Sequence, residues 1–156
     1  MGVIVGSGDY TYRACETWAQ LPPDMILGDV AAVGVDSKDR VYVFNRSKHP
    51  MLVFERDGRF LKSWGEDIFT HPHGVSMGPD DTIYCTDDHD HTVRKCTPEG
   101  KVLLALGEAG VPGADHTHFN LPTEVAVLPD GSFYVSDGYK NTRVMKCPAD
   151  GRFEFE

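Results

Sequence analysis

Residues 74–107 read GVSMGPDDTIYCTDDHDHTVRKCTPEGKVLLALG, and related versions of this stretch come before and after it along the chain. Each copy is anchored by a tyrosine within a short apolar run. A valine lies nine positions before each tyrosine, and a glycine lies 16, 16 and 17 positions after it. The three sets are Val33, Tyr42 and Gly58; Val75, Tyr84 and Gly100; and Val125, Tyr134 and Gly151. Such an internal repeat is typical of a chain built from stacked, similar units.

Each copy contains four short extended segments that are separated by turns rich in Gly, Pro and Asp. The segments around the tyrosines are dominated by β-branched and aromatic residues, which favours strands over helices. The clearest segments are 41–44, 83–86 and 133–136, and the clearest turns are 57–58, 79–81 and 129–131. The tyrosines are 42 and then 50 residues apart, and the excess falls in residues 108–119. This pattern predicts an all-β fold, a β-propeller of four-stranded blades.

The repeats divide the chain into an N-terminal segment, residues 1–29, and three blades at about 30–66, 71–107 and 121–156. A propeller needs at least about four blades to close. We therefore expect half of a six-bladed ring, completed by a second chain as a homodimer about a two-fold axis. The alternative is a piece of a longer protein. Residues 10–18 alternate weakly, and we expect them to supply a ring-closing strand.

The net charge and the distribution of apolar residues argue against some classes of function. The net charge of −9 comes with no basic patch, which argues against nucleic-acid binding. There is no run of 18 apolar residues and no signal-peptide pattern in the sequence as printed, so we expect a soluble, cytoplasmic protein that does not bind membranes.

The four cysteines lack CxxC spacing, and Cys96 and Cys147 fall at the position in the repeat where the first copy has Phe54. We expect both to fill the core.

Three motifs carry a more specific resemblance. The third repeat contains YVSDGYKNTRV at 134–144, which resembles the NHL repeat. Residues from about 28 to 152 resemble the first half of the catalytic domain of the peptidyl-α-hydroxyglycine α-amidating lyases and of related bacterial proteins. The matching pieces are GVDSKDRVYVFNR at 34–46, HPHGVSM at 71–77 and FNLPTEVAVLPDGSFYVSDGYKNTR at 119–143. The resemblance implies a zinc-dependent lyase that breaks a C–N bond in its central channel, giving a peptide amide and glyoxylate.

The same resemblance implies a zinc ligand at His73, the first of three histidines that lie on inner strands of different blades. The second and third histidines have no match in this sequence. Catalytic zinc normally has three protein ligands. A homodimer would supply two copies of His73, and His71 or a loop histidine could complete the set; otherwise no zinc is bound. A non-metal role for His73 remains the alternative.

Two catalytic residues are implied in the same way. Arg46 would hold the substrate carboxylate and oxyanion, for which a planar guanidinium is suited; the alternative is a surface ion pair. Tyr139 would take the hydroxyl proton of the substrate, which requires a nearby cation or metal; the alternative is packing between blades. The resemblance also implies calcium at the backbone carbonyl groups of Val33 and Val75, although the family's carboxylate ligand lies in a blade that this sequence lacks.

The other histidines remain without a role. We interpret Asp88 to His91 as a polar turn between strands, and residues 108–120, with His116 and His118, as a flap or a linker. Three functions therefore remain open. They are an amidating lyase, a non-catalytic NHL module that binds peptide or protein, and a propeller hydrolase or lactonase with carboxylate-bound calcium.

Overall fold

The computed structural model describes residues 2–156, which form thirteen β-strands and no helix. The first sheet contains β3 (Asp29–Val35), β4 (Val41–Arg46), β5 (Met51–Phe54) and β6 (Phe60–Trp64); the second contains β7 (Pro72–Met77), β8 (Ile83–Asp87), β9 (Thr92–Cys96) and β10 (Val102–Leu106); the third contains β11 (Glu124–Val127), β12 (Phe133–Asp137) and β13 (Arg143–Cys147). An N-terminal hairpin joins β1 (Ile4–Ser7) to β2 (Tyr10–Arg13). Within this range no helix could cross a membrane.

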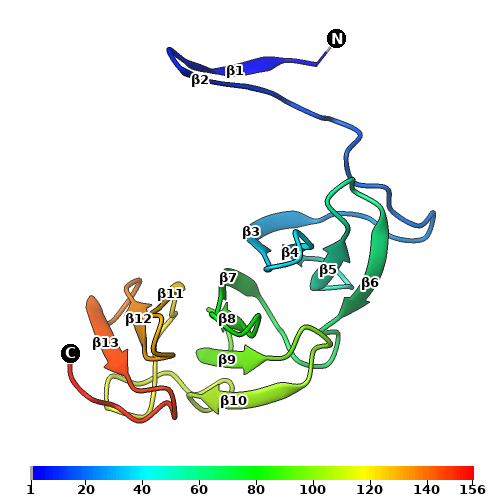
Figure 1. Ribbon diagram of the computed structural model, residues 1–156. Helices are drawn as coiled ribbons and strands as arrows, with labels where there is room; N and C mark the ends of the chain where they lie inside the picture. Colours follow the sequence, from blue (N-terminus) through cyan, green and yellow to red (C-terminus); the bar gives the residue numbers. More distant parts are fainter. Residues whose placement is uncertain (1) are drawn as a thin grey trace.

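The three sheets stand next to one another along an arc, each with its first strand on the concave side (Figure 1). All strand pairs within a sheet are antiparallel and follow chain order. The first strands β3, β7 and β11 contact their neighbours in the adjacent sheets. This is the arrangement of propeller blades around a centre, so the predicted all-β propeller fold is confirmed. The third sheet has three strands plus an antiparallel bridge between Lys146 and Phe155, where a fourth strand was predicted.

The hydrophobic core lies between the blades. Tyr42 of the first blade is buried in one cluster with Ile83 and Cys85 of the second. Tyr84 of the second blade packs on Phe133 of the third, with ring centroids 5.1 Å apart. Because Tyr42 and Tyr84 are both buried against the next blade, a single repeat could not bury its apolar face alone. The prediction that cysteines fill the core is also confirmed, since Cys96 and Cys147 are both buried.

The glycine near the end of each repeat allows close contact with the chain segment that covers that side of the blade. In the second and third repeats this segment is the outermost strand of the preceding blade, and in the first it is the segment around Trp18. These glycines have φ values of +87°, +89° and +80°, and a Cβ atom on any of them would approach its neighbour within 2.8 Å or less. The contacts pair Gly58 with Trp18, Gly100 with Trp64, and Gly151 with Leu104. Trp18 thus replaces a preceding blade, and its indole N–H donates to the carbonyl oxygen of Arg56 at 3.0 Å.

The β1–β2 hairpin pairs only with itself and lies apart from the blades (Figure 1). Several of its apolar side chains are exposed, including Ile4 and Tyr12. The ring-closing role expected for residues 10–18 stays a prediction.

A buried side chain at the end of each second strand holds the loop that leads into the first strand. The residue three positions after the repeat tyrosine is fully buried and accepts a backbone N–H from the residue 17 positions earlier. The pairs are Asn45 with Gly28, Asp87 with Thr70, and Asp137 with Asn120. Asp87 also accepts the N–H groups of His71, at 2.9 Å, and of Asp90, at 3.1 Å.

We expect Asp87→Ala to destabilise the protein by about 3 kcal/mol or more, because it leaves the backbone N–H groups of Thr70, His71 and the buried Asp90 without their acceptor. Urea unfolding followed by fluorescence measures the change. Asp67→Ala is the matched control, since Asp67 is exposed, and its midpoint should equal that of the unmodified protein. Equal midpoints for Asp87→Ala and the unmodified protein would contradict this role of Asp87.

Candidate functional site

The structure brings together the three residues for which the sequence predicted catalytic or zinc-binding roles, one from each blade. Arg46 ends β4, His73 is the second residue of β7, and Tyr139 follows β12 by two residues. The Arg46 Nε–H donates to the carbonyl oxygen of Pro72 at 3.1 Å. The His73 Nε2 atom lies 3.1 Å from the Tyr139 hydroxyl oxygen. A continuous chain of contacts therefore links the three blades at this point.

The hydrogen bonds of His73 determine which ring nitrogen carries the proton. Its Nδ1 atom lies 2.9 Å from the carbonyl oxygen of Thr123, which can only accept. Nδ1 is therefore protonated, and a neutral ring has its lone pair on Nε2. The Tyr139 O–H donates to that lone pair, with the two rings at 76°. Nε2 is consequently also the only ring atom of His73 that could bind a metal ion.

Neighbouring strands fix the orientation of the His73 ring. The Thr123 carbonyl oxygen also accepts from the Thr86 hydroxyl at 2.9 Å, and the Thr86 hydroxyl oxygen accepts from the Gly74 N–H at 2.7 Å. These bonds join β7, β8 and the residue before β11. A ligand histidine whose second nitrogen is held in this way has a fixed tautomer and orientation.

Arg46 borders an open pocket of about 340 Å³. The pocket is also lined by the residues that follow Arg46 and by a segment that precedes β3, namely Ser47, Lys48 and His49, and Asp24, Ile26 and Gly28. Beyond its bond to Pro72, the Arg46 side chain makes no hydrogen bond or ion pair with another residue in the range 2–156. Its two terminal nitrogens are therefore available to bind a carboxylate in bidentate fashion.

His73 fits a zinc site as one ligand, but the described residues do not complete the site. The group of His, Cys, Asp or Glu donors that converge within residues 2–156 is His71, Asp88 and His89, which excludes His73. Further ligands for a catalytic zinc at His73 would have to come from elsewhere. Val33 and Val75 lie on the neighbouring inner strands β3 and β7, and calcium at their carbonyl groups stays a prediction.

Sequence reasoning missed the pairing of His71 with Asp88. Residues 88–91 do form the turn between β8 and β9, as predicted, but the Asp88 side chain is buried and its Oδ1 lies 2.6 Å from His71 Nδ1. The His89 ring stacks on His71 with centroids 3.8 Å apart. The strand register carries the signal, because β7 and β8 pair Pro72 with Asp87 and the next antiparallel pair is His71 with Asp88.

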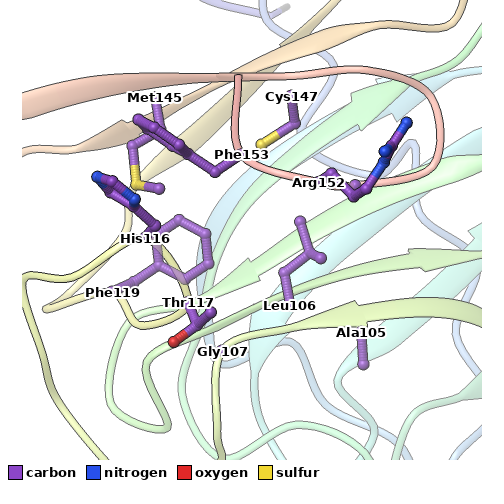
Figure 2. A pocket seen from close by; sticks show the side chains of 11 residues that line it. Ala105, Leu106, Gly107, His116, Thr117, Phe119, Met145, Cys147, Arg152 and Phe153 are labelled. Carbon is purple, nitrogen blue, oxygen red and sulfur yellow. The ribbon is translucent and has the colours of Figure 1, made fainter. Parts of the chain in front are cut away.

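The long loop before the third blade is tied to that blade. The Arg143 guanidinium donates to the carbonyl oxygens of Ala114, Asp115 and His118, at 2.7 to 2.9 Å. These bonds favour a loop that is held against the third blade over a mobile linker, and the role of a flap stays a prediction. The loop also lines a pocket of about 430 Å³, in which His116 stacks on Phe153 (Figure 2). None of the predicted site residues lines this pocket.

Comparison with known proteins identifies relatives of this chain. No family model matches it. It is 41% identical over 153 residues to peptidyl-alpha-hydroxyglycine alpha-amidating lyase 1 of Drosophila melanogaster, covering 80% of this chain and 28% of that protein. It is 31% identical to the peptidyl-glycine alpha-amidating monooxygenase of Mus musculus, covering 94% of this chain and 18% of that protein. With NHL repeat-containing protein 3 of Homo sapiens the identity is 31%, over 89% of this chain and 44% of that protein.

Solved structures support the propeller fold of this chain. A protein of unknown function from Bacteroides thetaiotaomicron superposes with a TM-score of 0.66 at 23% identity, covering 81% of this chain and 35% of that chain. A virginiamycin B lyase from Staphylococcus aureus gives a TM-score of 0.62 at 14% identity, covering 93% of this chain and 43% of that chain. This chain thus spans less than half the length of each of these proteins.

We expect NMR to find neutral His73 protonated at Nδ1, because the Thr123 carbonyl oxygen accepts from that atom. Long-range ¹H–¹⁵N correlation spectra distinguish the two tautomers. Tyr139→Phe should leave the tautomer unchanged while removing the bond at Nε2. A ring protonated at Nε2 would contradict the assigned direction of both hydrogen bonds.

Proposed function

Since the chain is an NHL-repeat propeller that resembles the peptidyl-α-hydroxyglycine α-amidating lyases, we propose that it forms part of a lyase active site for an α-hydroxyglycine derivative. The reaction would break the C–N bond and give an amide and glyoxylate. The observation that carries the proposal is the convergence of Arg46, His73 and Tyr139 from three blades.

Arg46 is proposed to bind the carboxylate of the substrate. Its terminal guanidinium nitrogens are unpaired within residues 2–156, and it borders a pocket whose other charged or titratable residues are Lys48, His49 and Asp24. Binding at two nitrogens would fix both the position and the rotation of the carboxylate, and so the direction in which the hydroxyl group points.

Tyr139 and His73 are proposed to receive the hydroxyl proton. The Tyr139 O–H already donates to His73 Nε2, so the phenolic oxygen can accept a proton from the substrate as its own proton moves to the imidazole. The C–O bond then becomes a carbonyl, the C–N electrons move to the amide nitrogen, and that nitrogen takes up a proton. The fixed Nδ1–H of His73 supports this direction of transfer, because only Nε2 can accept.

Zinc is proposed to bind His73 as one of several ligands, and it would polarise the substrate hydroxyl group when bound. Because the Nε2 lone pair can serve either the ion or the Tyr139 hydroxyl, zinc at His73 is proposed as an alternative to proton transfer through His73, and not as a partner of that transfer. Additional ligands would come from a second copy of the chain or from the remainder of a longer protein. Calcium at Val33 and Val75 is proposed as a structural ion between the first two blades.

A homodimer of half-propellers is proposed to close the ring and to form a central channel for the peptide or small-molecule substrate. Three blades form an open arc (Figure 1), and two copies would provide six. A second candidate function is a non-catalytic NHL module that binds peptide or protein. The second and third zinc histidines of the lyases have no match in residues 1–156, which favours this second function.

We expect Tyr139→Phe and His73→Ala each to lower kcat/KM for an N-acyl-α-hydroxyglycine by about 100-fold or more, the usual effect of losing a proton-transfer group. Arg46→Ala should raise KM, and Arg46→Lys should restore only part of the binding. Glyoxylate release measures the rate. Arg56→Ala is the control, because the Arg56 side chain is 84% exposed. A protein that binds the substrate but releases no glyoxylate, with or without added zinc, would favour the binding module.

Native mass spectrometry tests the proposed dimer. We expect a species of twice the 17.3 kDa chain mass at micromolar concentration. A deletion of residues 2–14, which contain the β1–β2 hairpin, should weaken it if the hairpin helps to close the ring. A strictly monomeric protein would contradict the closed ring of two chains and point to blades supplied by a longer protein.

A further inference from the structure

His71, Asp88 and His89 form a compact donor cluster at the end of the second blade where the β8–β9 turn lies. One potential ligand atom from each residue lies within 4.8 Å of the other two. We propose that this cluster binds a divalent transition-metal ion of the zinc class, at a site separate from His73. The proposal is independent of the function suggested above.

The backbone holds two of the three residues in place before any ion binds. The His71 N–H donates to Asp87 at 2.9 Å, and the Asp88 N–H donates to the His71 carbonyl oxygen at 3.4 Å. The first of these bonds ties His71 to the Asp87 carboxylate, and the second extends the ladder between β7 and β8 by one residue at its end. A metal site needs ligands held close to their final positions by rigid elements, and His71 and Asp88 meet that condition.

The charge of Asp88 supports a cation at this place. Burying a carboxylate is costly unless it is paired or hydrogen-bonded. Three other buried aspartates form ion pairs with arginine: Asp36 with Arg40, Asp90 with Arg94, and Asp137 with Arg143. Within residues 2–156, Asp88 pairs only with the His71 imidazole, although just 8% of its side chain is exposed. Asp87 is buried without an arginine among the described residues, but it accepts three backbone N–H groups. Within the same range Asp88 has neither kind of partner, and a bound dication would supply the missing positive charge.

The donor set selects the class of ion. Two imidazole nitrogens and one carboxylate oxygen suit Zn²⁺, Ni²⁺ and Cu²⁺, whereas Ca²⁺ and Mg²⁺ prefer oxygen ligands alone. Three protein ligands leave a fourth tetrahedral position for water or for a donor atom of a bound molecule.

Binding requires the His89 ring to turn. The rings of His71 and His89 are stacked, 3.8 Å apart and within 9° of parallel. A single ion cannot lie in the planes of both rings in that arrangement. His89 is exposed, and its ring takes part in none of the hydrogen bonds found between described residues, so it is free to rotate towards the ion.

This cluster is distinct from the His73 site because the two imidazoles have different partners. His71 Nδ1 pairs with Asp88, whereas His73 pairs with Thr123 and Tyr139. The two sites can therefore be emptied one at a time by substitution.

Equilibrium dialysis against Zn²⁺, with metal content measured by mass spectrometry, tests the site in the purified protein. The His73→Ala background removes any zinc bound there. In that background we expect one Zn²⁺ per chain, and the further substitution His89→Ala or Asp88→Asn should weaken binding at least about 10-fold. His116→Ala is the matched control, since it removes an exposed histidine outside the cluster and should leave binding unchanged. Excess Ca²⁺ should not displace the zinc.

The inference is overturned if the His73→Ala protein binds no zinc, or if adding His89→Ala leaves its affinity unchanged. Because His89 is exposed, its substitution should preserve the fold, which circular dichroism would verify. Zinc that is lost on His73→Ala but retained on His89→Ala would contradict this site and support the proposed lyase site. The reverse result would support this site alone.

Discussion

The blades depend on one repeated constraint: a buried polar side chain at the end of the second strand fixes the backbone that leads into the first strand. Asn45, Asp87 and Asp137 each occupy this position and are fully buried. Each accepts an N–H group 17 residues earlier, so the contact closes a loop of constant length in three different sequences. Buried donors and acceptors must be paired. The constraint therefore ties the segment that leads into each inner strand to the end of the second strand of the same blade.

The candidate site follows from this constraint combined with packing between blades. Asp87 fixes the backbone at residues 70 and 71, and His73 comes two residues later on β7. The adjacent blade then holds the ring through Thr123 and places Tyr139 against Nε2. Arg46 reaches the same strand from the other side through the Pro72 carbonyl oxygen. Because each blade contributes one residue, the geometry of the site depends on the register between blades.

Much of the fold could be predicted because its determinants are local. Turn residues, the apolar runs and the constant spacing of Val, Tyr and Gly identify four-stranded units without any knowledge of long-range contacts. The separate β1–β2 hairpin could not be predicted, since residues 10–18 carry only a weak alternation that suits a ring strand equally well. The resemblance to known lyases located Arg46, His73 and Tyr139. Their mutual contacts depend on three blades and could not be read from one repeat.

The pairing of His71 with Asp88 shows how strand register can carry information that a motif search overlooks. A sequence of alternating Asp and His in a turn looks like a solvated surface, and the exposed His89 agrees with that interpretation. The ladder between β7 and β8, however, pairs Pro72 with Asp87, and the next pair in that register is His71 with Asp88. Nearby, the Nε2 lone pair of His73 is already used by Tyr139. Both sites therefore hold a hydrogen-bonded imidazole, but only the His71 cluster adds a buried carboxylate, at Asp88, whose negative charge would attract a dication.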